Sequence, residues 1–309
     1  MNIFLLPKSI IKEVDKFCLW FLWGNNGSRS NFHLTAWSKV CLPKIFGGLD
    51  FGDGTNWNKA MLGKYIWAIS HQQDTLWVKW ISSIYLKGRN FWSYQLNLDS
   101  SWYWRKLYHF REHFSQHAID TAGHGGKFKI GRFYSNQIEL EKVKNHNFVW
   151  NNFSVPKHRF IVWQAIYGKL LTRDNLRLVI PSVEGDCPVC EEMAENHCHL
   201  FLRCEFSLRV VKLVQDWLGR SWPLDYEAWK LWIESLDKGF SAKVVAASCS
   251  AVIYHIWLNR NVCVFNSYSY IVYKIINRIK KEVIYRVNTY SHLNWKDKDR
   301  KLFYLLEFF

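Results

Sequence analysis

Apolar residues recur at a spacing of three to four positions along most of the chain, which is the pattern of helices with one buried face. The first such stretch covers residues 7–23, where Ile10, Val14 and Phe21 fall on one stripe. Pro7 suits the first turn of this helix, since its fixed backbone angle matches a helix start. The same periodicity predicts helices over residues 57–69, 74–86, 156–168, 171–178, 207–219, 225–236, 241–265 and 270–287.

Polar and glycine-rich stretches mark where these helices end. Thr172 is a candidate N-cap for the helix at 171–178, and Gly219 is a candidate C-cap for the helix at 207–219. Residues 25–31 read as a loop. The sequence "AGHGG" breaks the helical pattern at residues 122–126, and "KFKIGRFY" then alternates as a short strand would. We therefore expect a mainly α fold with helical bundle-like halves and at most a short strand or hairpin near residues 127–134.

Residues 187–204, "CPVCEEMAENHCHLFLRC", contain four of the eight cysteines and two histidines. The cleanest ligand set has the spacing C-x2-C-x8-H-x4-C and consists of Cys187, Cys190, His199 and Cys204. Three thiolates and one imidazole match the tetrahedral preference of zinc, and a closed set of four leaves no position for a catalytic water. We expect one structural zinc ion, with His197 or Cys198 as alternatives to His199. The predicted fold therefore consists of the helical bundle-like halves together with a small Cys3His zinc module.

The composition favours a polyanionic partner. There are 41 Lys and Arg residues against 26 Asp and Glu, which gives a net charge of +15 and a pI near 9.4. Such a charge favours nucleic acid or an anionic membrane surface. Most of the 18 tryptophans are expected in the core. No secretory signal and no run of eighteen apolar residues is visible, so we expect a nuclear or cytoplasmic protein with reduced cysteines and no membrane span.

The cysteine segment is acidic, whereas its flanks are basic. Residues 184–196 carry five acidic residues and no Lys or Arg, so this loop is expected to repel phosphates. The candidate phosphate-binding cations on its flanks are Lys157, Arg159, Lys169, Arg173, Arg209 and Lys212. The alternative is a basic face on the last long predicted helix, formed by Lys274, Arg278 and Lys281.

Two stretches, "VWNNFSVPKHRFIVWQAIYGKLLTRDNL" (149–176) and "CPVCEEMAENHCHLFLRCEFS" (187–207), resemble a known family. They are similar to the zinc-binding domain that follows reverse transcriptase in plant LINE-type (non-LTR) retrotransposons. The matching residues are Trp150, Pro156, Lys157, Trp163, Leu171, Thr172, Leu176, Cys187, Cys190, His199, Leu200, Phe201 and Cys204. Residues 254–265, "YHIWLNRNVCVF", are similar to the helix that closes this region, through Trp257, Arg260, Asn261 and Phe265.

The resemblance extends to residues 1–69, which look like the segment between the polymerase palm and the zinc domain. The glycine-rich break at residues 122–126 is the best candidate for a domain boundary. Together with the resemblance it gives three parts: a helical connection (1–120), the zinc-binding domain (121–220) and C-terminal helices with a basic tail (221–309). No adjacent Asp-Asp pair occurs, although the polymerase of these elements needs one, and endonuclease and ribonuclease H signatures are missing too. The chain thus resembles a part detached from the polymerase.

These features predict a non-catalytic, zinc-stabilised module that binds RNA or DNA, with a reverse transcriptase polypeptide as a further partner. Two alternatives remain open at this point. The chain is either an interaction scaffold that docks on a reverse transcriptase, or a relic of a retroelement without a selected function.

Overall fold

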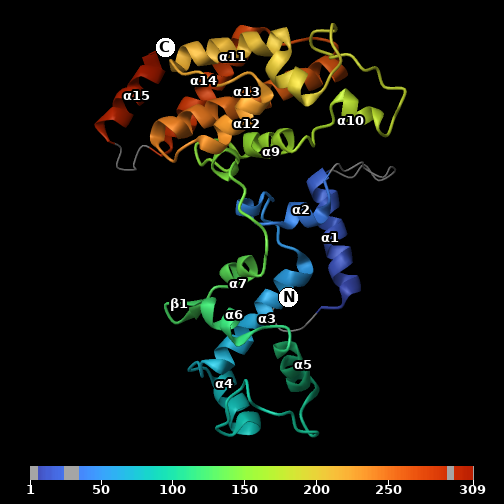
Figure 1. Ribbon diagram of the computed structural model, residues 1–309, viewed down its shortest axis with the longest axis vertical. Helices are drawn as coiled ribbons and strands as arrows, with labels where there is room; N and C mark the ends of the chain where they lie inside the picture. The colour runs from blue at the N-terminus through green and yellow to red at the C-terminus, as the bar shows by residue number, and fades with distance from the viewer. Residues whose placement is uncertain (1–5, 24–34, 291–295, 309) are drawn as a thin grey trace. The chain divides into compact units, whose positions relative to one another are not determined.

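The computed structural model describes residues 6–23, 35–290 and 296–308, and it contains two compact units, Met1–Lys142 and Val143–Phe309 (Figure 1). Regular structure in the described residues is helical apart from one two-stranded sheet, which confirms the predicted mainly α fold. The predicted loop at residues 25–31 lies outside the described residues. The division into three parts stays a prediction, and the boundary between the two units falls inside the expected zinc-binding segment.

The first unit is built from short helices around an aromatic core. In chain order its elements are α1 (Lys8–Trp23), α2 (Trp37–Cys41), the 3-10 helix η1 (Lys44–Phe46), α3 (Gly54–Ser70), α4 (Leu76–Ile81), the π-helix η2 (Ser82–Leu86), α5 (Trp102–Arg111), α6 (Gln116–Thr121), β1 (Gly123–His124), β2 (Lys127–Phe128) and α7 (Ile130–Asn136). Trp104 is fully buried and stacks on Tyr85, with ring centroids 4.8 Å apart. Burial of such large rings is the main stabilising contribution expected here.

The predicted hairpin near residues 127–134 exists but is short. β1 pairs with β2 in antiparallel fashion, and Gly125 and Gly126 form the turn with positive φ angles of 58° and 70°. That conformation favours glycine at both positions. The strand does not extend through "KFKIGRFY", because the chain turns into α7 at Ile130. Phe133 of this helix is then buried against Phe128, with ring centroids 5.3 Å apart.

The helix predicted at residues 7–23 is observed as α1, but its apolar stripe does not form the buried side. Ile11 is the buried residue of this helix, whereas Ile10, Phe17 and Phe21 are exposed. The periodicity therefore predicted the helix correctly and assigned its apolar stripe to the wrong face.

The second unit is a larger helical assembly. Its elements are α8 (His146–Val149), α9 (Pro156–Ile166), α10 (Arg173–Arg177), the π-helix η3 (His199–Arg203), α11 (Glu205–Leu218), α12 (Tyr226–Ser235), α13 (Phe240–Asn266), α14 (Val272–Asn288) and α15 (Asp297–Phe308). α13 is the core helix, and α9, α11 and α14 all pack against it (Figure 1). Gly219 ends α11 with a φ of 58°, as the sequence predicted.

α13 is also the one helix in the described residues that is long and apolar enough to cross a membrane. Its most apolar 18-residue window has a mean hydropathy of 1.3, and 67% of that window is buried inside the protein. The apolar character of α13 is explained by burial, since neighbouring helices cover most of its surface.

Candidate metal centre

The first half of the centre is a tight turn that carries Cys187 and Cys190. The Cys187 N–H donates to the Met193 carbonyl (2.7 Å), and the Glu191 N–H donates to the Cys187 carbonyl (2.8 Å). A bridge between Asp186 and Ala194 closes the base of this loop. These bonds fold the C-x2-C motif back on itself, so that both sulfurs are available to one ion.

The second half comes from the π-helix η3 and the start of α11. The Asn196 side chain accepts a hydrogen bond from the His199 N–H (2.8 Å) and so begins this turn. The Cys204 N–H donates to the His199 carbonyl (2.7 Å), which sets these two side chains on the same side. Cys204 is also the N-cap residue of α11, where free N–H groups and the helix dipole favour a thiolate.

The structure brings together the four residues with the predicted spacing. The ligand atoms of Cys187, Cys190, His199 and Cys204 all lie within 4.8 Å of one another. The Cys190 Sγ is 3.3 Å from the His199 Nε2. Cys187, His199 and Cys204 are buried, while Cys190 is partly exposed. Such a compact set of three sulfurs and one nitrogen has the donors of a tetrahedral structural zinc site.

The side chains of Cys187 and Cys204 form a hydrogen bond with each other. The Cys187 thiol donates to Cys204, which raises the pKa of Cys187 and lowers the pKa of Cys204; burial raises both. Backbone N–H groups of Ser207 and Phe206 add to the lowering of the Cys204 pKa. One thiolate is thus already favoured, and a bound cation would displace the proton from the other.

His197, one of the two alternatives to His199, faces elsewhere. His197 Nε2 accepts a hydrogen bond from the Leu170 N–H (3.2 Å), and its Nδ1 lies 3.4 Å from Thr172 Oγ1. Burial lowers the pKa of His197, which keeps it neutral and able to accept this bond. Neither His197 nor Cys198 belongs to the four-residue cluster found among the described residues. His197 therefore holds the turn that leads into α10.

Glu195 has a role that the sequence analysis missed. Its carboxylate is fully buried and forms a bidentate pair with Arg260 of α13, at 2.7 Å to Nε and 2.8 Å to Nη2. It also accepts the Arg173 N–H (2.7 Å), so Glu195 rather than Thr172 caps α10 with its side chain. The charge of Glu195 is thus balanced by Arg260, so this residue adds little to the repulsion of phosphates that was expected of the loop. The only signal for this pair in the sequence was Arg260, which lies in the stretch 254–265 that resembles the closing helix of the family.

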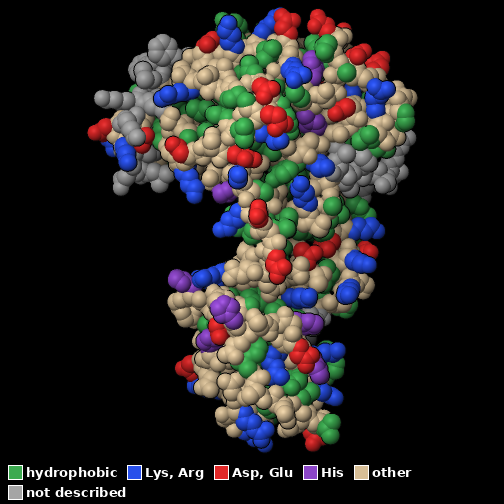
Figure 2. Space-filling model, in the orientation of Figure 1, with side chains coloured by type: hydrophobic (Ala, Val, Ile, Leu, Met, Phe, Trp, Pro, Cys, Tyr) green, Lys and Arg blue, Asp and Glu red, His purple; other side chains and the backbone are tan. Residues whose placement is uncertain are grey.

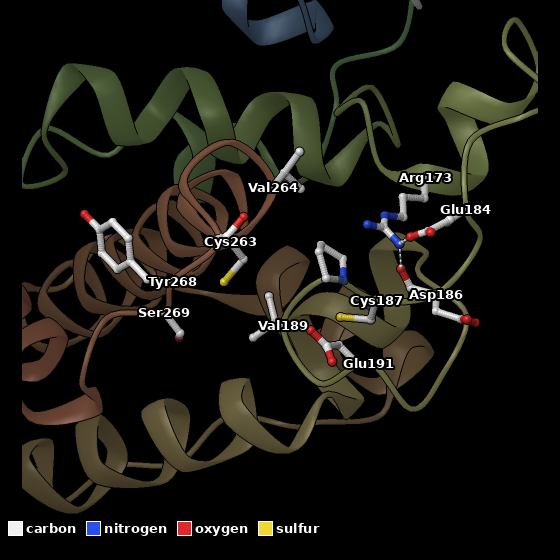
Figure 3. A pocket seen from close by; sticks show the side chains of 12 residues that line it. Arg173, Glu184, Asp186, Cys187, Val189, Glu191, Cys263, Val264, Tyr268 and Ser269 are labelled. Atoms are coloured by element: carbon white, nitrogen blue, oxygen red, sulfur yellow. Dashed lines mark hydrogen bonds and ion pairs between the residues drawn. The ribbon is translucent and has the colours of Figure 1, made fainter.

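A pocket of about 650 Å³ lies beside Cys187 (Figure 3). Arg173 reaches Glu184 (3.3 Å) and the Asp186 carbonyl (2.7 Å) on one side, and Cys263 and Tyr268 lie on the opposite side. Cys263 is only partly buried and lines this pocket. The lining is mainly acidic and polar, which disfavours a phosphate ligand here.

Most of the predicted phosphate-binding cations of the flanks already have partners. Lys157 pairs with Glu282, Arg173 with Glu184, and Arg209 with Glu205. Arg159 donates to the carbonyls of Ser154 (3.0 Å) and Asn152 (2.9 Å) and so holds the loop before α9. Among the described residues no ion pair involves Lys169 or the exposed Lys212. On the face in Figure 2, basic and acidic side chains of the second unit are interspersed.

Comparison with known proteins agrees with this geometry. Residues 128–210 match the family described as zinc-binding in reverse transcriptase. The chain is 35% identical over 88 residues to an Arabidopsis thaliana protein named "Putative ribonuclease H protein", a match that covers 28% of this chain and 14% of the relative. It is 30% identical over 131 residues to an Arabidopsis thaliana "Uncharacterized mitochondrial protein", covering 42% of this chain and 85% of the relative. No solved structure matches the chain. The chain belongs to the family of proteins that carry the zinc-binding domain of reverse transcriptases.

Proposed function

We propose that this chain is a zinc-stabilised, non-catalytic module that binds RNA or DNA and derives from the reverse transcriptase of a non-LTR retrotransposon. One zinc ion is held by Cys187, Cys190, His199 and Cys204. The convergence of these four donors and the family match support this assignment. Four protein ligands fill a tetrahedral shell, so the ion fixes the loop against α11 and activates no water.

Nucleic-acid binding is supported most strongly by the exposed face of α14. Lys274, Arg278 and Lys281 are exposed, and none of the three has an ion pair within the described residues. Their spacing continues to Tyr285, which is 73% exposed, so three cations and one aromatic ring share a helical stripe. A row of cations with an accessible ring can follow a phosphate backbone and stack on a base.

The cations beside the zinc loop form the second part of the proposed surface. Exposed ion pairs such as Arg209–Glu205 are weak because water screens both charges, so a phosphate can compete for the cation at small cost. Lys169 and Lys212 need no such exchange. Arg159 contributes least to phosphate binding. If its side chain turned to a phosphate, the carbonyls of Ser154 and Asn152 would lose their hydrogen-bond donor.

Two matched triple variants distinguish these surfaces. The α14 variant is Lys274→Gln, Arg278→Gln and Lys281→Gln; the zinc-flank variant is Lys169→Gln, Arg209→Gln and Lys212→Gln. Binding to single- and double-stranded RNA and DNA is measured against salt concentration. We expect the α14 variant to lower the salt slope by roughly two to three units, at about 0.7–0.9 per lost phosphate contact. The zinc-flank variant should have a smaller effect.

The charge-preserving variant Lys274→Arg with Lys281→Arg is the control and should keep the slope of the unmodified protein. Zinc content and the melting curve are recorded for every variant, so that loss of binding is separated from loss of fold. Unchanged slopes in both triple variants would contradict the nucleic-acid proposal.

We further propose that the chain catalyses no nucleic-acid chemistry. The absence of an adjacent Asp-Asp pair from the sequence supports this, since polymerase activity in such elements depends on one. The purified chain, with Mg²⁺ or Mn²⁺, should extend no primer and cut neither duplexes nor RNA–DNA hybrids. An activity that co-purifies with the protein and disappears in a point variant would overturn this part.

An interaction scaffold that docks on a reverse transcriptase is the second candidate, and α1 favours it. Ile10, Phe17 and Phe21 lie on one exposed apolar face of this helix, and Phe21 is 88% exposed. Exposed apolar faces of this kind are typical of protein-binding surfaces. Replacing Phe17 and Phe21 by Ser should then abolish co-purification with a co-expressed reverse transcriptase of a related element, while nucleic-acid binding stays intact.

A further inference from the structure

Three side chains of the second unit converge at a place remote in sequence from the cysteine cluster. His158 comes from the first turn of α9, His255 from the middle of α13, and Glu282 from α14. One ligand atom from each lies within 4.8 Å of the other two. Both histidines are almost completely buried, and the Glu282 side chain is 23% exposed, which leaves a route from solvent.

The contacts within this cluster are unusual for a group held by hydrogen bonds alone. Two imidazole nitrogens approach the same carboxylate oxygen, with Glu282 Oε2 at 3.0 Å from His158 Nε2 and 2.9 Å from His255 Nε2. The His255 contact is a hydrogen bond, whereas His158 Nε2 lies at ion-pair distance from the same oxygen without the alignment of a hydrogen bond. One carboxylate oxygen is thus shared by two buried imidazoles, an arrangement that the donors of one metal ion adopt.

We infer that His158, His255 and Glu282 form a second metal site, which takes a divalent transition-metal ion of the zinc class. Two imidazoles and one carboxylate are a common protein donor set for such ions. Ligand atoms held about 2.0–2.2 Å from one ion lie roughly 2.9–3.5 Å apart at the usual angles. The two contacts of Glu282 Oε2, at 3.0 and 2.9 Å, already have this spacing, and all three ligand atoms lie within 4.8 Å of one another. Three protein ligands leave a position open for water or a further ligand.

The ion would join three helices that pack around the core of the unit. α9 and α14 both contact α13, and each supplies one donor to the site. Lys157 lies next to it, with Nζ 3.1 Å from the other carboxylate oxygen, Glu282 Oε1, and 4.8 Å from the centroid of the Tyr254 ring. This cation competes with the metal for the Glu282 charge, so the site binds its ion more weakly than the cysteine cluster does.

Cobalt is the probe that separates the two sites. The full chain is purified with the cysteine site filled by Zn²⁺, and Co²⁺ is then titrated. We expect one further equivalent to bind, with the d–d absorption of cobalt bound by nitrogen and oxygen and without thiolate-to-cobalt charge transfer. His255→Gln and Glu282→Gln should each weaken this binding by more than ~100-fold, since loss of an outer-shell partner alone costs about 10–100-fold. The exposed-histidine variant His117→Gln is the control and should bind as the unmodified chain does.

The variant Lys157→Met should change the affinity for Co²⁺ in the opposite direction to the two ligand variants. Removal of the competing cation should raise the affinity for Co²⁺ severalfold, which a merely structural lysine would not do. If the ligand variants fail to fold, cobalt-edge X-ray absorption of the unmodified protein decides: imidazole and oxygen neighbours support the site, and sulfur neighbours overturn it. Absence of any ion beyond the cysteine cluster, or retention of the cobalt signal in folded Glu282→Gln, would likewise overturn the inference.

Discussion

Two histidines one residue apart, His197 and His199, show what the sequence could and could not settle about individual residues. The spacing of the cysteines predicted a four-residue cluster, because few other arrangements place three thiols and an imidazole so close in a polar segment. The choice between the histidines depends on the direction of each side chain in η3, which spacing does not encode. His199 points to the sulfurs, and His197 accepts the Leu170 N–H.

Replacing each histidine by alanine should therefore affect a different property, namely zinc content for His199 and stability for His197. His199→Ala should reduce zinc content, because three ligands remain. His197→Ala should keep the zinc but destabilise the fold by about 1–3 kcal/mol, since the Leu170 N–H loses its acceptor. Metal analysis and denaturant unfolding measure both, with Cys198→Ser as a control that keeps zinc and stability. Zinc loss in His197→Ala alone would move the ligand to that residue.

The buried pair of Glu195 and Arg260 provides a second test with single residues. Glu195→Gln leaves the Arg260 charge buried without a counter-ion, so we expect a loss of about 3–5 kcal/mol in unfolding free energy. Glu192→Gln, in the exposed part of the same loop, should change stability by less than about 0.5 kcal/mol. Equal effects of the two changes on urea unfolding would show that the pair is not formed.

Among the helices, periodicity succeeded where one face is buried over many turns. α11, α13 and α14 lie close to their predicted ranges, because a long amphipathic or wholly apolar segment has few alternatives. It failed where a helix is short or rich in aromatic residues. α5 was not predicted because Trp and Tyr occur on several of its sides and obscure the period. α6 and α8 were not predicted because helices of six and four residues are too short to show a period. In α7, packing of Phe133 decides the structure against the local strand pattern.

The end of α11 offers a test at this level. Gly219 has a φ of 58°, and a Cβ in that conformation costs about 1–2 kcal/mol. Gly219→Ala should lower the unfolding free energy of the second unit by about that amount. Gly131→Ala in α7 is the matched control: its backbone is helical and a Cβ there meets nothing within 4 Å, so stability should stay the same or rise. Similar losses in both variants would argue against the left-handed C-cap.

The whole molecule consists of two compact units, and only part of that organisation could be predicted from the sequence. The glycine-rich stretch at residues 122–126 contains β1 and the turn to β2, and β1, β2 and α7 pack within the first unit, which ends at Lys142. Glycines mark a tight turn as readily as a linker, so the division of the chain into three parts stays a prediction. The cysteine cluster and the His158 cluster both lie in the second unit.

This organisation predicts that zinc stabilises the second unit alone. Residues 143–309, expressed by themselves, should fold, bind zinc and lose their cooperative melting transition when a chelator removes it. In the full chain, Cys187→Ser or Cys204→Ser should lower only the transition assigned to that unit, whereas Cys18→Ser in α1 should keep the metal. Calorimetry of the fragment and the full chain measures this. A fragment with the same melting curve with and without zinc would contradict a structural role for the ion.

The Glu195–Arg260 pair also predicts how positions 195 and 260 vary among relatives of this protein. Its two members lie 65 positions apart, with Glu195 inside the cysteine segment and Arg260 in α13, and loss of either would leave the other buried without a counter-ion. Lineages should therefore change both positions together or neither, so that an apolar residue at one is accompanied by an uncharged residue at the other. A decaying copy of the gene would drift at the two sites independently. Correlated substitution at these positions is thus a signature of selection for the folded protein.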